Sequence, residues 1–191
     1  IKFDGVDDRI DITDSPVFHG AQATWLAWVN FRLLAGPKCW LAKGTYSTSW
    51  SFAFEMESSN AELRLFITNS ETDNGANHGT TPALQIVAGQ WHHIGVVYDG
   101  SGATNPDRLK CYIDSVDQTL SFVGTIPASL TDSSSPLRLG EFTGLGRNLD
   151  GLLDDVRIYN RALFDSEIRQ LYVETYDGGY GSLAMGRRTI V

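Results

Sequence analysis

The chain of 191 residues carries 15 Lys and Arg against 23 Asp and Glu, a formal net charge of −8 at pH 7. Its length fits one large domain, and 42% hydrophobic with 20% charged residues supplies a core and excludes disorder for the bulk of the chain. The sequence has none of the Lys and Arg clusters that phosphate binding needs, so we expect no nucleic-acid partner. No apolar run approaches the roughly 20 residues that span a bilayer.

Two features bear on the compartment of the protein. The sequence begins at Ile1 in a segment typical of a strand, so we expect upstream residues, with a signal peptide as one candidate. Cys39 and Cys111 are too few for a disulfide scaffold and lack the close spacing of zinc sites. We interpret them as two buried small hydrophobic residues, with a single disulfide as the alternative.

Turn signals recur every 8 to 15 residues along the chain, from Asp4-Gly5 to Asp150-Gly151. The short runs between them are rich in β-branched and aromatic residues, which favours an all-β sandwich. Residues 63–68 and 109–113 alternate with a period of two, so we expect one buried and one wetter face there. Residues 94–98 are apolar nearly throughout and predict a central strand covered on both sides.

One stretch near the end has a helical period. After Asp165, the expected N-cap, Ile168, Leu171 and Tyr172 fall at i, i+3 and i+4 and predict a short amphipathic helix. Beyond Tyr176 the composition changes to a glycine-rich segment followed by nine residues that are too few to fold alone. We therefore predict a domain over 1–176, then a linker and C-terminal arm over 177–191.

Four segments together, matched in order and spacing, resemble the laminin G-like domains of the concanavalin A-like lectin/glucanase superfamily. The resemblance extends over about residues 1 to 173 and implies a jelly roll of two antiparallel sheets, one concave and one convex. In the family's Asp-Gly hairpin the glycine is replaced here by Ser115, which leaves the turn type open. The four segments are Phe3 to Ile10, Thr24 to Val29, Trp91 to Gly100 and Gly151 to Leu163.

The terminal strands and a pair of tryptophans allow two further expectations. In such a sandwich the termini pair as neighbouring strands, so Ile1 to Phe3 and Leu152 to Ile158 should lie side by side. Trp25 and Trp28 lie three positions apart, an odd spacing, and therefore point to opposite faces of a strand. We expect one to fill the core between the sheets and the other to pack under the helix.

Catalysis would need carboxylates that the sequence does not present. The family's glucanase branch uses Glu-x-Asp-x-x-Glu or a near variant, and no such run occurs. Glu55 and Glu57 form a close pair at even spacing, which we interpret as the solvated end of a strand. His92 and His93 are adjacent, point to opposite faces and match a structural strand motif of the resembling family. We predict that the protein is not an enzyme, with a divergent glycanase or lyase as a lesser alternative.

Aspartates near both termini predict a metal site. If the terminal strands pair, hard carboxylate oxygens converge from two loops, which suits Ca²⁺ better than a transition metal. The resemblance points to Asp4 and Asp154 for a structural calcium, and we add Asp8 and Asp155 as ligands. The alternative is that these aspartates cap turns. The two groups are Asp4, Asp7 and Asp8, and Asp150, Asp154 and Asp155.

Carbohydrate recognition needs aromatic faces with polar groups nearby. Tyr46 and Trp50 lie in segments that we expect to be exposed, as does the polar loop from Asn69 to His78. The main hypothesis is a non-catalytic lectin-like module that binds glycan or protein outside the cytoplasm, at a cell surface or on a virion. The alternative is a decoration or fibre domain of a virion or surface layer, assembled into an oligomer through Leu183 to Val191.

Overall fold

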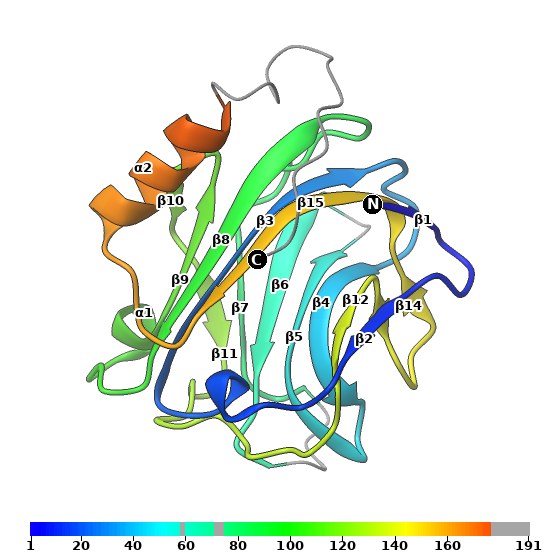
Figure 1. Ribbon diagram of the computed structural model, residues 1–191. Helices are drawn as coiled ribbons and strands as arrows, with labels where there is room; N and C mark the ends of the chain where they lie inside the picture. The colour runs from blue at the N-terminus through cyan, green and yellow to red at the C-terminus, as the bar shows by residue number, and fades with distance from the viewer. Residues whose placement is uncertain (58–59, 71–74, 177–191) are drawn as a thin grey trace.

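The computed structural model describes residues 1–57, 60–70 and 75–176. Two antiparallel sheets of six and seven strands pack face to face, with one C-terminal helix outside them (Figure 1). The predicted all-β sandwich is therefore confirmed. Among the described residues, no helix has the length and apolar character to cross a membrane.

The six-stranded sheet contains the first and the last strand of the fold. Their pairing places Phe3 opposite Gly151 and Asp4 opposite Asp150, which confirms the expected closure of the termini. The strands in spatial order are β1 (Lys2–Asp4), β15 (Asp150–Tyr159), β3 (Gln22–Phe31), β8 (Trp91–Asp99), β9 (Leu109–Ile113) and β10 (Val116–Gln118).

The seven-stranded sheet forms the second layer, and a short hairpin lies beside it. The strands in spatial order are β11 (Ser121–Val123), β7 (His78–Thr80), β6 (Glu62–Ile67), β5 (Ser49–Glu57), β4 (Lys38–Thr45), β12 (Leu137–Leu139) and β2 (Ile10–Ile12). The hairpin consists of β13 (Glu141–Phe142) and β14 (Arg147–Asn148). Short helical turns occur at η1 (Pro16–Phe18) and α1 (Asn105–Arg108).

The core lies between the two sheets and follows the predicted alternation. Leu63, Leu65 and Ile67 of β6 face it, as do the odd-numbered residues of β9. Trp25 enters it from β3, with ring centroids 4.6 Å from Phe52. Cys39 and Cys111 are buried and free, so the interpretation as small hydrophobic residues holds and the disulfide alternative does not.

Helix α2 (Asp165–Thr175) covers the outer face of the six-stranded sheet (Figure 1). Ile168 is buried there beside Leu26 and Val97. Trp28 packs under the helix as predicted, because its indole nitrogen donates to Thr175 Oγ1 over 2.9 Å. The expected N-cap is one residue off: Asp165 is the first helical residue, and Glu167 accepts the backbone N–H of Phe164 instead.

Strands β8 to β10 bear on two smaller expectations, the opposite facing of His92 and His93 and the type of the turn at Ser115. His92 accepts the Val87 amide through Nε2 and contacts Asp114 through Nδ1, whereas His93 lies against Trp28 on the other face. The turn between β9 and β10 has φ of 51° at Asp114 and 66° at Ser115, which defines a type I′ hairpin without glycine. The predicted linker and arm over 177–191 lie outside the described residues, so the assembly hypothesis stays a prediction.

Candidate functional site

A pocket of about 180 Å³ opens on the outer face of the seven-stranded sheet. Strands β5, β6 and β7 form its floor, and the β13–β14 hairpin and the segment after β4 form its sides. It combines a cluster of aromatic side chains with three basic ones. Its lining residues are Tyr46, Trp50, Arg64, Phe66, Gly75, His78, Phe142 and Arg147.

A β-bulge places Trp50 in this pocket. The register shifts between Lys43 and Gly44, so that Gly44 faces Trp50 while Lys43 faces Phe52. Trp50 therefore joins the outer face, although Phe52 points into the core. Gly44 is required there, because its φ is +107° and a Cβ would lie 2.1 Å from the Ser49 carbonyl oxygen.

The expectation that Trp50 is exposed is wrong, since only 1% of its surface meets solvent. Its ring lies 5.3 Å from Phe142, 5.8 Å from Tyr46 and 6.3 Å from Phe66, measured between centroids. It forms the wall of the pocket, while Tyr46 is half-buried beside it. Their contact with a sugar stays a prediction.

Glu55 forms a buried ion pair beside the pocket. Both of its carboxylate oxygens accept hydrogen bonds from Nη1 of Arg147, which reaches over from β14. Glu55 is 0% exposed, so the interpretation of residues 55–57 as a solvated strand end is wrong for this residue. Burial raises the pKa of Glu55, and the adjacent Arg147 opposes that rise.

Arg64 and His78 complete the polar lining of the pocket. Arg64 Nη1 pairs with Glu57 at 3.1 Å, and its guanidinium lies 5.9 Å from the ring centre of Phe66. The Nε of Arg64 is buried and has no hydrogen-bond partner among the described residues. Burial lowers the pKa of His78, and its Nδ1 lies 3.1 Å from the carbonyl oxygen of Gly75.

Sequence reasoning missed these basic residues to different degrees. The alternation over 63–68 already assigns Arg64 and Phe66 to the face opposite the core, so their placement was readable. His78 ends the polar loop that the sequence singled out, of which residues 71–74 lie outside the described part. Arg147 carried no local signal, because it reaches Glu55 only through the fold of a hairpin 92 residues away.

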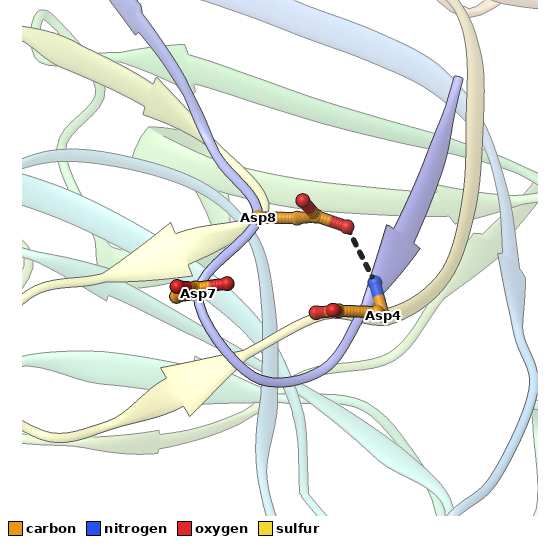
Figure 2. A group of neighbouring side chains, drawn as sticks. All are labelled: Asp4, Asp7 and Asp8. Carbon is orange, nitrogen blue, oxygen red and sulfur yellow. Dashed lines mark hydrogen bonds between the residues drawn. The ribbon is translucent and has the colours of Figure 1, made fainter.

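The N-terminal loop holds a second candidate site. The carboxylates of Asp4, Asp7 and Asp8 approach within 4.8 Å of one another in an exposed loop (Figure 2). Asp8 also accepts the backbone N–H of Asp4, and Asp4 accepts that of Val6. Three hard oxygen donors at this spacing fit a cation such as Ca²⁺, so this group could hold a metal.

The aspartates near the C-terminus do not join that group. Asp150 is the residue opposite Asp4, but Arg32 holds both of its carboxylate oxygens at 2.6 and 2.7 Å. Asp154 lies four residues beyond Asp150 along β15, which separates the two by roughly 13 Å at about 3.3 Å per residue. Asp155 sits at a bulge and pairs with Arg157. The predicted set of Asp4, Asp8, Asp154 and Asp155 is therefore not assembled into one site.

The sequence matches a family model over residues 4–169, and the chain belongs to that family, the Laminin_G_3 domains of the concanavalin A-like lectin/glucanases superfamily. The resemblance seen in the sequence is thereby confirmed. A search of curated proteins found no matching relative.

Solved structures with the same fold include lectin-like and carbohydrate-binding domains. A SAP-like pentraxin from Limulus polyphemus is 15% identical with a TM-score of 0.66, and the match covers 90% of this chain and 80% of that one. Domain 4 of AbnA, an extracellular GH43 arabinanase from Geobacillus stearothermophilus solved with arabinotriose, is 21% identical with a TM-score of 0.67, covering 90% and 75%. The CBM40 of a Ruminococcus gnavus IT-sialidase, bound to α2,3-sialyllactose, is 13% identical with a TM-score of 0.68, covering 90% and 95%.

Proposed function

We propose that this chain is a non-catalytic carbohydrate-binding module and that the pocket on the outer face of the seven-stranded sheet holds the sugar. The observation that carries the proposal is the lining of that pocket, where Tyr46 and Trp50 lie beside Arg64, His78 and Arg147. An aromatic wall with a few polar groups at its edge is the arrangement that binds the apolar face and the hydroxyls of a sugar ring.

The comparisons support the same proposal. Two of the similar structures were solved with an oligosaccharide, domain 4 of the arabinanase in complex with arabinotriose and the CBM40 bound to sialyllactose. Their identity to this chain is low, so the likeness supports a class of function and not a particular sugar. We also keep the proposal that the module acts outside the cytoplasm, in line with the extracellular arabinanase.

The absence of catalysis is part of the proposal. Retaining hydrolysis needs two reachable carboxylates about 5 to 5.5 Å apart. Glu55 is fully buried with both oxygens bonded to Arg147, and Glu57 pairs with Arg64. Neither carboxylate meets the pocket as a free acid or base. Product release abolished by the double change Glu55→Gln and Glu57→Gln would contradict this part.

A glycan array and titration calorimetry test the binding proposal. We expect binding to at least one oligosaccharide, and a rise in Kd of several-fold to about 10-fold for Tyr46→Ala, because an aromatic contact contributes about 0.5–1.5 kcal/mol. The half-buried Tyr46 is preferred to Trp50, whose removal would also open the wall of the pocket.

The matched control for this test is Phe164→Ala. Phe164 is an exposed aromatic residue at the N-cap of α2, the helix that packs on the other sheet. We expect its Kd values to equal those of the unchanged protein. Binding to no glycan on the array, or equal losses in both variants, would refute the proposed function at this pocket.

A further inference from the structure

The pocket presents hydrogen-bond donors in excess of acceptors. Arg64 and Arg147 are donor-only groups. The carboxylate beside Arg147, Glu55, is withdrawn from solvent, and the carboxylate beside Arg64, Glu57, is paired with it. We infer that the sugar bound here is an acidic one, carrying a carboxylate on the ring that enters the pocket. This inference rests on the proposed function and names the substrate class of the same site.

Arg147 is only partly used by the protein. Its Nη1 donates to both oxygens of Glu55, and the structure shows no bond from its Nε or Nη2 to any described residue. The side chain is 22% exposed and lines the pocket. The pair with Glu55 therefore fixes the guanidinium plane while leaving two donors for a ligand, and a planar carboxylate matches such a fork.

Arg64 adds donors from β6, the strand next to the one that carries Glu55. Its Nη1 binds Glu57, its Nε is buried without a partner among the described residues, and the side chain remains 28% exposed. A buried donor left unpaired costs about 1–3 kcal/mol. Because Nε is itself buried, a ligand oxygen would accept from the exposed part of the Arg64 side chain in the pocket and would leave that cost in place.

Acceptors are scarce on the same surface. The contact of His78 Nδ1 with the Gly75 carbonyl requires a hydrogen on Nδ1, which leaves Nε2 as an acceptor in the neutral ring. Burial lowers the pKa of His78 and keeps the ring neutral near pH 7. One imidazole nitrogen can bind a sugar hydroxyl, whereas the two guanidinium groups call for an acceptor-rich ligand group.

Directional hydrogen bonds from the two guanidinium groups, and not the net charge around the pocket, favour a carboxylate ligand. The two arginines are offset by Glu55 and Glu57, and the chain as a whole carries −8. Long-range attraction of an anion is therefore absent, and selection depends on short charge-assisted hydrogen bonds. We expect a correspondingly weak dependence of binding on salt.

The volume of the pocket limits how much of a glycan it can hold. The pocket has a volume of about 180 Å³. That is below the roughly 300 Å³ at which pockets for drug-sized ligands begin. A pocket of this size holds about one sugar ring, so the other rings of a bound glycan would lie outside it.

The test compares oligosaccharides that end in a uronic or sialic acid with twins whose carboxylate has been reduced or methyl-esterified. Titration calorimetry on the full chain should give at least about 10-fold tighter binding of the acidic twin, because hydrogen bonds to charged groups contribute about 1.5–3 kcal/mol. Equal or tighter binding of the neutral twin would overturn the inference and leave the proposed function intact. Binding of neither twin, nor of any other glycan, would refute both.

Three variants assign the effect to the pocket. Arg64→Gln removes one cation, and Arg147→Lys keeps a charge for Glu55 while removing the planar fork. Each should lower the preference for the acidic twin about 10-fold. Arg161→Gln, which breaks an exposed pair with Glu167 beside α2, is the matched control and should leave the preference unchanged. A preference that survives both pocket variants would place the acidic sugar elsewhere and overturn the inference.

Discussion

Lys43 brings a positive charge into the interior of the sandwich. Its side chain is 0% exposed, and Nζ donates to Asp14 at 2.6 Å and to the carbonyl oxygens of Ser133 and Ser135 at 2.5 and 2.8 Å. Three donors thus meet three acceptors, which is the condition under which a buried ammonium is tolerated. The contacts fasten the segment before β12 to strand β4.

We predict that Lys43→Met destabilises the protein by about 3 kcal/mol, measured by urea unfolding at pH 7. Removing one partner of a buried pair costs about 3–5 kcal/mol, and we expect the lower end because Asp14 is 24% exposed and keeps its contact with His19. Lys110→Met is the control, since Lys110 is exposed and lies 3.8 Å from Asp165; it should change stability by less than about 0.5 kcal/mol. A loss below about 1 kcal/mol for Lys43→Met would contradict this account.

At the scale of single residues, the sequence predicts the facing of apolar side chains well. It predicts the burial of polar side chains poorly. Trp25 and Trp28 were assigned to opposite faces from their spacing alone. Lys43 and Glu55 carry no such signal, because their burial depends on Asp14 and Arg147, which are distant in the sequence. A charged residue is tolerated inside only by partners that the tertiary fold brings to it.

Helix α2 forms an aromatic contact with the six-stranded sheet. His93 lies against both Trp28 and Tyr172, with ring centroids at 5.3 and 5.8 Å, and these two rings also stack on each other at 5.7 Å. Only 2% of His93 is exposed, and its Nδ1 has no partner among the described residues. Burial lowers the pKa of His93 to about 4, so the ring is neutral where the helix is docked.

This burial makes stability depend on pH. Between pH 6.5 and about 4 the unfolded chain binds a proton at His93 and the folded chain does not, so the free energy of unfolding falls as the pH is lowered through that window. The shift corresponds to about 3 kcal/mol. We predict that His93→Phe, compared with the unchanged protein by urea unfolding, gains about 2–3 kcal/mol in relative stability from pH 7 to pH 4.

The control for this prediction lies in the same contact. Tyr172→Phe keeps an aromatic ring against Trp28 and changes a group that does not titrate below pH 7. Its stability relative to the unchanged protein should stay flat from pH 7 to pH 4. A flat profile for His93→Phe as well would show that His93 is not the group responsible.

Elements were predicted from the sequence where periodicity is regular and missed where it is interrupted. Alternation or a continuous apolar run predicts strands over 63–68, 94–98 and 109–113, and these correspond to β6, β8 and β9. In β5 the even-numbered residues from 50 to 56 are all apolar, so strict alternation would place Trp50 on the core face with Phe52, although we expected an exposed Trp50. The bulge at Gly44 reverses that assignment and thereby builds the pocket. Bulges depend on the partner strand, so one strand's pattern cannot reveal them.

On the scale of the whole molecule, the sandwich joins its two ends. Strand β1 pairs with β15 at the edge of the six-stranded sheet, and the chain then turns through the loop of Asp4, Asp7 and Asp8 to reach β2 on the other sheet. This loop crosses from one layer to the next beside the β13–β14 hairpin, where Asn148 donates to the Val6 carbonyl oxygen. Fixing the loop would hold the first strand, the hairpin and both sheets together.

We therefore propose that Ca²⁺ binds at Asp4, Asp7 and Asp8 and stabilises the whole fold. A cation that binds only the folded chain adds about 2.7 kcal/mol at 100 times its Kd. For a domain of this size that raises Tm by about 5 to 10 °C. Thermal unfolding with calcium against a chelator measures the shift, which should be smaller with Mg²⁺ because that ion demands a stricter octahedral site.

Two double variants locate the site and separate it from the terminal pairing itself. Asp4→Asn with Asp8→Asn removes two charges yet keeps oxygen acceptors for the amides of Val6 and Asp4, so the fold should persist while the calcium shift disappears. Asp154→Asn with Asp155→Asn should retain the full shift, because these residues lie along β15 away from the loop; asparagine also tolerates the φ of 47° at residue 155. Loss of the shift in the second pair alone would reinstate the ligands near the C-terminus. If calcium did not shift the Tm of the unchanged protein, these aspartates would be capping groups of the loop. They already accept hydrogen bonds from its backbone amides without a metal.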